Sequence, residues 1–235
     1  LVDKDGVVFA VFVGRPAGGE SWQALFAELD QLLKQFRSSM SLKCEDHRRG
    51  TYATISTGYS FGGGRTVPMN IARSPRRHAA LRKLCSHPVL QRLVGFARSA
   101  FTFYMPKLYK KYVDCIMSLE KRDPTLQRPF ECSPFPAASF NFPPHTVTYE
   151  HVDAENLADG ICIVYAGGCF DYRAGGHLLL RQLGIAVEFP PTTLAIIPSA
   201  SILHGNVNTQ PGEERWSFTQ YAAGDLFRYE GCGFR

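Results

Sequence analysis

The 235-residue sequence lacks any apolar run that approaches the roughly 18 residues needed to cross a bilayer. It also lacks a basic segment followed by a short apolar stretch near residue 1, which is the pattern of a secretory leader. We therefore expect neither a membrane span nor a secretion signal. With 45% hydrophobic residues, the chain is long enough to bury one substantial core, or at most two small ones.

The cysteines lack the regular spacing of a structural framework. There are seven, an odd number, and no pair is arranged as C-x-x-C. This argues against a set of disulfides and against a zinc knuckle, and it favours reduced thiols inside a cell.

The glycine-rich stretch Phe61-Gly62-Gly63-Gly64-Arg65 lacks the Gly-Lys-Ser/Thr that completes a nucleotide-binding P-loop. Two interpretations remain. It is a mobile loop that presents Arg65 to a ligand, or it is a plain glycine turn.

Negative charge is scarce in the first part of the chain. Residues 1–130 carry 21 Lys and Arg against 10 Asp and Glu, a net charge of +11, and residues 131–235 carry 5 against 11, a net charge of −6. The two parts sum to the +5 of the whole chain. One interpretation is that the basic part binds a polyanion and the acidic part binds a cation. The other is that the basic residues form a solvated helical face.

The N-terminal part is predicted to be mostly helical. Residues 7–13 and 52–59 have strand composition, whereas apolar residues at intervals of three and four predict a helix over residues 22–36. From Pro75 to Lys121 the same spacing predicts helices, which Pro88 and Pro106 begin. The proline-rich stretch 123–136 is the expected internal boundary.

The C-terminal part is predicted to be all-β. Short apolar runs at 146–151, 161–165, 177–180, 186–189, 193–197 and 216–221 alternate with Gly and Pro turns every eight to twelve residues. We predict an α+β fold with a double-stranded β-helix (jelly-roll) core over 131–235. The basic, mostly helical residues 1–130 flank this core, and residues 1–235 form a single catalytic domain.

Two histidines and a carboxylate stand out within this β part. His151 ends one predicted strand, Asp153 lies two residues later, and His204 follows another predicted strand. Two histidines and one carboxylate can hold a non-haem ferrous ion on one face and leave positions open for a co-substrate and oxygen. Arg215, eleven residues after His204, could grip a carboxylate of that co-substrate, with Ser217 on the same strand face.

A series of short segments surrounds these residues. They are 151–156, Gly168-Cys169-Phe170-Asp171, Gly175-Gly176-His177-Leu178, Glu188-Phe189-Pro190-Pro191, Ile197-Pro198-Ser199-Ala200, His204-Gly205-Asn206, Glu214-Arg215-Trp216-Ser217 and Tyr221. Through these segments the sequence resembles the TET/JBP family of Fe(II)- and 2-oxoglutarate-dependent dioxygenases, and most of all its fungal branch. The similarity is dense over about 140–235, reappears at 47–50 and 61–65, and is loose elsewhere.

This resemblance implies a role for each matching residue. His151, Asp153 and His204 match the iron ligands, Arg215 matches the arginine that binds the distal carboxylate of 2-oxoglutarate, and Ser217 matches the hydroxyl beside it. The implied cofactor is Fe(II), with 2-oxoglutarate and O2 as co-substrates.

The resemblance also implies contacts with a flipped base. Asn156 matches a polar residue at the edge of the base, and Tyr221 matches an aromatic on which the base stacks. Related enzymes often carry a histidine two positions after that aromatic, where this chain has Ala223. The resemblance therefore implies the chemistry and leaves the identity of the base open.

The implied function is oxidation of the methyl group of methylated bases in duplex DNA. The expected reaction converts 5-methylcytosine to 5-hydroxymethylcytosine and further products, and N6-methyladenine is a second candidate base. The expected partner is methylated duplex DNA, and the expected form is a monomer in the nucleus. Basic side chains would hold the phosphates, and the candidates are Arg48, Arg49, Arg65, Arg76 and Arg77.

Two other functions are consistent with the same residues. One is a hydroxylase that acts on a protein or a small molecule, against which the basic N-terminal part and the loop at Arg65 argue. The other is a reader of methylated DNA that has lost turnover, against which the intact His151, Asp153, His204 and Arg215 argue.

Overall fold

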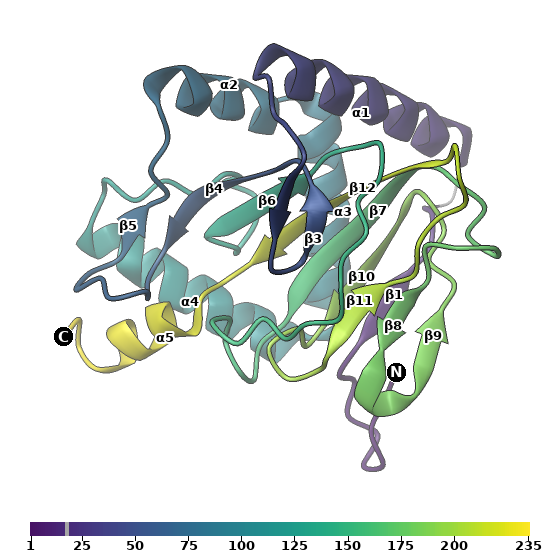
Figure 1. Ribbon diagram of the computed structural model, residues 1–235. Helices are drawn as coiled ribbons and strands as arrows, with labels where there is room; N and C mark the ends of the chain where they lie inside the picture. Colours follow the sequence, from purple (N-terminus) through teal and green to yellow (C-terminus); the bar gives the residue numbers. More distant parts are fainter. Residues whose placement is uncertain (17–18) are drawn as a thin grey trace.

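Two antiparallel sheets face each other, and the N-terminal helices cover the outer face of the larger sheet (Figure 1). The structure is a computed structural model that describes residues 1–16 and 19–235. The predicted α+β class, with a double-sheet core and flanking N-terminal helices, is confirmed. No helix among the described residues is long and apolar enough to cross a membrane.

The larger sheet mixes strands from both parts of the chain. Its strand order is β1-β10-β7-β12-β6-β4-β5, so β1 and β4 from the basic part pair with β10 and β6 from the acidic part. The bounds are β1 Val11–Val13, β4 Thr54–Ser60, β5 Met69–Asn70, β6 Ala137–Asn141, β7 Cys162–Cys169, β10 Thr193–Ile197 and β12 Glu214–Tyr221.

The larger sheet buries side chains on both faces. Along β7, Ile163 and Tyr165 pack into the cluster formed with the helices, whereas Cys162 and Ala166 pack toward the smaller sheet. This alternation follows from the two-residue period of a strand. The helices beneath are α1 Gly19–Ser39, α2 Pro75–Cys85, α3 Pro88–Tyr104 and α4 Pro106–Arg122, and a further helix, α5 Gly224–Gly231, follows β12.

Proline and apolar spacing define these helices as the sequence predicts. Proline occupies the first turn of α2, α3 and α4, where its missing N–H has no intrahelical partner to lose. Ser74 caps α2 by accepting a hydrogen bond from the backbone N–H of Arg77. Helix α5 was not predicted from the sequence.

The smaller sheet has the order β11-β8-β9, with β8 Leu178–Leu180, β9 Ile185–Val187 and β11 His204–Asn206. A short 3₁₀ turn, η1 Arg181–Leu183, joins β8 to β9. A separate hairpin is formed by β2 Glu45–His47 and β3 Gly50–Tyr52. The segment at Thr148 and Tyr149 connects this hairpin to the smaller sheet, because the N–H of Tyr149 donates to Arg49 O at 2.8 Å and the N–H of Asn206 in β11 donates to Thr148 O at 2.9 Å.

The predicted strand over residues 146–151 is wrong as a continuous strand, because its hydrogen-bond partners change along the segment. The N–H of Thr148 donates to the side-chain Oδ1 of Asn206, whereas the N–H of His151 donates to the backbone of His204. Within the described segment 146–151 the pairing is therefore a single bridge, between His151 and His204.

Two predicted N-terminal strands are also modified. The strand predicted over 7–13 is reduced to β1, because Asp3 Oδ1 accepts hydrogen bonds from the N–H groups of Asp5 and Val7 and holds the preceding residues in a local turn. The strand predicted over 52–59 is divided between β3 and β4 at Ala53, whose carbonyl accepts from Phe142 N–H instead.

Gly167 provides a test of how tightly the larger sheet packs. It pairs with Trp216, and a Cβ at this position would lie 2.0 Å from the indole ring. Trp216 is fully buried and donates from Nε1 to Asp30 Oδ1 at 2.6 Å, so the indole ring cannot move aside without losing packing and this hydrogen bond. We expect Gly167→Ala to lower the free energy of unfolding by about 1–3 kcal/mol in urea denaturation.

The matched control is Gly95→Ala within α3, where a Cβ meets nothing within 4 Å. Alanine should stabilise this helical position by roughly 0.5–1 kcal/mol. Equal effects of the two substitutions would contradict the packing described at Trp216.

Candidate metal centre

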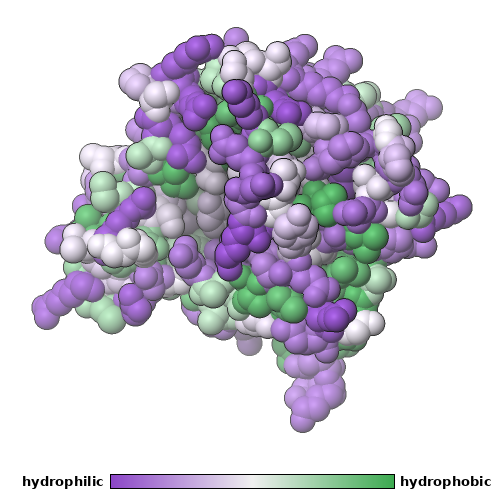
Figure 2. Space-filling view, in the orientation of Figure 1, coloured by the Kyte–Doolittle hydropathy of each residue, from purple (hydrophilic) through white to green (hydrophobic). Residues whose placement is uncertain are grey.

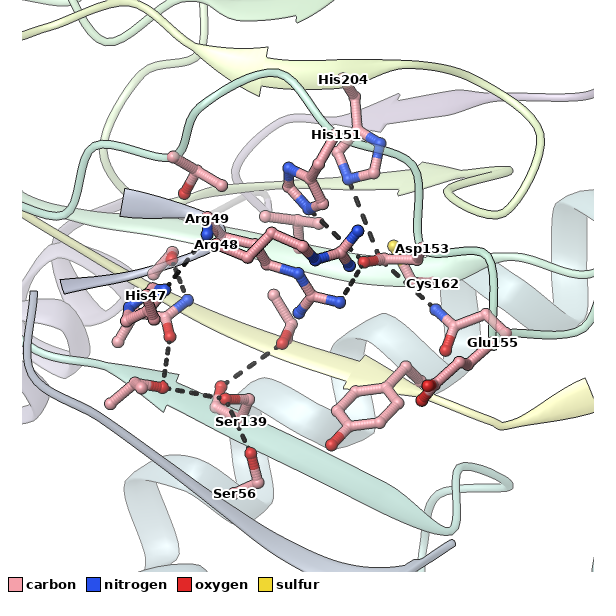
Figure 3. Close-up of a pocket in the computed structure, with 18 of the residues that line it drawn as sticks. His47, Arg48, Arg49, Ser56, Ser139, His151, Asp153, Glu155, Cys162 and His204 are labelled. Carbon is pink, nitrogen blue, oxygen red and sulfur yellow. Dashed lines mark hydrogen bonds and ion pairs between the residues drawn. The ribbon is translucent and has the colours of Figure 1, made fainter. Parts of the chain in front are cut away.

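Three predicted ligands converge on one point between the sheets. Candidate ligand atoms of His151, Asp153 and His204 all lie within 4.8 Å of one another. His151 Nε2 is 3.4 Å from one carboxylate oxygen of Asp153, and His204 Nε2 is 3.9 Å from the other (Figure 3). His204 belongs to β11, His151 pairs with it, and the N–H of Asp153 is anchored on Ser199 O at 2.9 Å.

Both imidazoles are oriented by the backbone. His151 Nδ1 lies 2.7 Å from Tyr149 O, and His204 Nδ1 lies 2.9 Å from Ile202 O. A carbonyl accepts only from a protonated nitrogen, so these contacts assign the proton to Nδ1 and leave the Nε2 lone pairs for a metal. Burial lowers the pKa of His204, although the carbonyl and Asp153 oppose this, and the lowered pKa favours the neutral form that binds a metal.

Asp153 is held in its ionised form. Burial alone would raise its pKa, but the adjacent His151 and the positive charge of Arg49 lower the pKa to about 2. Arg49 Nη2 lies 2.6 Å from Asp153 Oδ1, so this arginine, one of the candidates for a DNA contact, contacts the triad. The donor set of two neutral histidines and one carboxylate fits ferrous iron.

Arg215 places a positive charge deep in the same cavity. It is 2% exposed, and its Nη1 donates to Thr146 O at 2.8 Å. Burial lowers its pKa to about 10, which leaves the guanidinium protonated at neutral pH. Its Nε has no hydrogen-bond partner, and no carboxylate in the described part of the chain forms an ion pair with it. A buried guanidinium without an anionic partner is costly, so an anionic ligand would stabilise it. A carboxylate suits its planar arrangement of N–H donors.

Ser217 extends this anion-binding wall. It lies two residues after Arg215 on the same face of β12 and is 4% exposed. Its hydroxyl accepts from Asn141 Nδ2 at 2.9 Å, and Asn141 Oδ1 accepts from Thr54 Oγ1 at 2.8 Å. The residues present therefore fit the distal carboxylate of 2-oxoglutarate.

Sequence reasoning missed several residues of the cavity. Tyr52 in β3 is 3% exposed and lines the same cavity as Arg215. Asn141 is the last residue of β6, and Ser56 and Ser139 form a hydrogen bond at 3.2 Å across β4 and β6 (Figure 3). The available signal was the alternation of polar with buried apolar residues in β4 and β6, where Ser56 follows Ile55 and Ser139 precedes Phe140.

The cavity has a volume of about 700 Å³ and opens on a largely hydrophilic face. Figure 2 shows this face hollowed between the β2–β3 hairpin and strands β4 and β5. Arg48, Arg65 and Arg73 line it together with the triad, and Arg73 was not among the predicted residues.

Two predicted base contacts also line this cavity. Asn156 Nδ2 donates to Ser199 Oγ at 3.1 Å and lies 3.4 Å from Asp153 Oδ2, so it also braces the metal-binding loop. Tyr221 is half-buried at the end of β12, and burial raises the pKa of its hydroxyl.

Two predicted DNA contacts lie elsewhere. Arg76 and Arg77 are exposed on α2 and are absent from the described lining of the cavity. Arg76 Nη2 donates to Ser39 O at the end of α1, at 2.9 Å.

Comparison with known proteins places this geometry in a recognised fold. No family model and no curated protein matches the sequence. The solved structure of NgTET1 in complex with 5mC DNA is similar over 94% of this chain and 74% of that one, with 16% identity and a TM-score of 0.67. A Pseudomonas putida prolyl-4-hydroxylase matches over 92% of both chains, with 12% identity and a TM-score of 0.51.

The chain has the fold of the 2-oxoglutarate and Fe(II) oxygenases. The resemblance to the TET/JBP family is thereby supported at the level of the fold. At identities of 16% and 12%, these similarities show the fold and not the substrate.

Asp153 supplies the sharpest test of the metal centre. We expect Asp153→Ala to weaken Co(II) binding, measured by calorimetry as an air-stable substitute for Fe(II), by at least about 100-fold. Loss of an outer-shell partner alone costs 10–100-fold, and here a charged ligand is removed. Glu155→Ala removes an exposed carboxylate from the rim of the same cavity and should leave the affinity unchanged. Unaltered binding by Asp153→Ala would show that the metal is held elsewhere.

Proposed function

We propose that this protein is an Fe(II)- and 2-oxoglutarate-dependent dioxygenase that oxidises the methyl group of a methylated base in DNA. One observation carries the chemistry. A His-Asp-His cluster and a buried guanidinium without a carboxylate partner share a single cavity. The cluster suits ferrous iron, and the guanidinium suits the far carboxylate of 2-oxoglutarate.

The protein's own residues would position the reactants. Iron with bound 2-oxoglutarate supplies the activation of O2 for C–H oxidation, with release of succinate and carbon dioxide. Arg215 and Ser217 hold the co-substrate at its distal end, and the backbone carbonyls behind His151 and His204 keep both imidazoles in a fixed orientation. The surrounding walls exclude bulk water from the reacting methyl group.

Three features support a nucleic-acid substrate. The cavity mouth carries Arg48, Arg65 and Arg73, and a volume of about 700 Å³ exceeds what 2-oxoglutarate alone requires. The fold matches NgTET1, a protein solved in complex with 5mC DNA. A base in a duplex must leave the stack to reach a buried centre, and Asn156 and Tyr221 line the space that it would enter.

The preferred substrate is 5-methylcytosine, converted to 5-hydroxymethylcytosine and further products, and N6-methyladenine is the second candidate. Ala223, where related enzymes often carry a base-contacting histidine, is 4% exposed and packs beside Leu226. It is outside the described lining of the cavity, so the short side chain adds no space there for a base. We further propose a single catalytic domain that works as a monomer in the nucleus.

A hydroxylase acting on a protein or small molecule is the alternative. The observation that favours it is the match to a prolyl-4-hydroxylase over 92% of both chains. The arginines at the cavity mouth favour the nucleic-acid substrate.

Arg215 tests the proposed co-substrate. We expect Arg215→Ala to raise the 2-oxoglutarate concentration for half-maximal succinate formation by roughly 10- to 150-fold, because hydrogen bonds to a charged group contribute about 1.5–3 kcal/mol. Ser217→Ala should cause a smaller increase, roughly 2- to 12-fold for a neutral hydrogen bond. Affinity for duplex DNA should stay near that of the unmodified protein. Unchanged 2-oxoglutarate dependence in Arg215→Ala would remove this residue from the co-substrate site.

The substrate is tested by mass spectrometry of nucleosides. Duplexes that carry 5-methylcytosine or N6-methyladenine are incubated with the protein, Fe(II), ascorbate and 2-oxoglutarate, with Asp153→Ala as the inactive control. We expect oxidised cytosines from the first duplex. Loss of methyladenine alone would identify the second base, and succinate without any modified base would favour the hydroxylase alternative.

A further inference from the structure

A second cavity of about 410 Å³ lies between α2 and strands β4 and β5. It shares Ile71 and Arg73 with the lining of the metal cavity, so the two spaces adjoin. Its size falls within the roughly 300–1,000 Å³ typical of ligand sites. Nothing in the proposed reaction uses this space.

Two of the three amide side chains in the described lining of this second cavity, those of Asn70 and Gln91, are already engaged. Asn70 Nδ2 donates to Thr125 O at 2.7 Å, and Asn70 Oδ1 accepts from Gln127 N–H at 2.9 Å. Gln91 Nε2 donates to Cys85 O at 2.8 Å. Because these groups are satisfied within the protein, they offer little to a neutral polar ligand such as a base edge.

The cationic side chains are less fully engaged. Arg128 is held by Glu120, with 2.8 Å between Arg128 Nε and Glu120 Oε1. Across the described residues, the guanidinium of Arg82 and the imidazole of His78 make no hydrogen bond or ion pair, and Arg73 donates only to Ala72 O.

The geometry of α2 groups these cations. His78 and Arg82 are four residues apart on the helix, so they project from one face, and Arg73 lies just before the helix begins. Glu131 is the sole carboxylate of the described lining. Arg73 and Arg82 therefore leave the wall with a net positive charge even when His78 is neutral.

We propose that this cationic wall, formed by Arg73, His78 and Arg82, binds a backbone phosphate of the strand whose target base enters the metal cavity. The inference rests on the proposed nucleic-acid function. A phosphodiester supplies charge and acceptor oxygens to the unengaged donors, and it needs none of the satisfied amides. Arg73, which lines both cavities, puts this phosphate next to the path of the base.

The test measures binding of a fluorescein-labelled methylated duplex by anisotropy, between about 50 and 200 mM salt. Loss of one phosphate contact should reduce the slope of log affinity against log salt concentration by about 0.9. We expect this reduction in Arg82→Ala and recovery of the slope in Arg82→Lys. The control is Lys83→Ala, because Lys83 is an adjacent exposed cation on α2 outside the described lining of the cavity.

Each other outcome overturns the inference in a recognisable way. A normal slope in Arg82→Ala, while the unmodified protein binds DNA, removes the phosphate site and leaves the proposed function intact. Equal reductions of the slope in Arg82→Ala and Lys83→Ala indicate that the DNA responds to the overall positive charge of α2 and not to a phosphate site. Absence of DNA binding by the unmodified protein refutes the nucleic-acid function itself. In the last case, inorganic phosphate raises the melting temperature of the unmodified protein but not that of Arg82→Ala, while Arg82→Ala keeps a normal slope with the duplex. That result assigns the cationic wall to a free anion.

Discussion

The backbone hydrogen bonds that His151 and His204 exchange are the interaction on which the site depends. Each residue donates its N–H to the carbonyl of the other at 2.9 Å, so two distant segments form one antiparallel pair. The imidazole centroids consequently lie 4.4 Å apart, and both Nε2 atoms approach Asp153. A metal site built on paired backbone is fixed more closely than one built on loops, because the ligand positions follow from the pairing itself.

The charges of the cavity are arranged around this pair. Arg49 reaches Asp153 from the β2–β3 hairpin, and Arg215 approaches from β12 on the larger sheet. The first guanidinium has an anionic partner in the protein, whereas the second, among the residues that the structure describes, donates only to the carbonyl of Thr146. A buried cation without an anionic partner lowers the stability of the fold, so Arg215 is better explained by a ligand than by a structural role.

The sequence predicted the elements whose signals are local. The apolar stripe of α1 and the prolines that begin α2, α3 and α4 determine helices without reference to the rest of the chain. The pairing of β4 with β6 was inaccessible, because it joins residues some eighty positions apart and depends on packing across the whole sheet. The same limit explains the site. His151, Asp153 and His204 could be named from residue type and order, but the approach of Arg49 to Asp153 requires the hairpin to dock beside Tyr149.

Strand alternation accounts for both the core and the cavity. In β12, Trp216 and Phe218 are buried against the helices, whereas Arg215 and Ser217 face the cavity. In β6, Phe140 joins the core and Ser139 lines the cavity. A shift of one residue in the pairing of these strands would exchange the two faces, moving Arg215 into an apolar core and aromatic rings into the polar cavity. The register that buries the aromatic residues is thus the register that presents the guanidinium and hydroxyls to a ligand, and stability and site geometry are specified by one pattern.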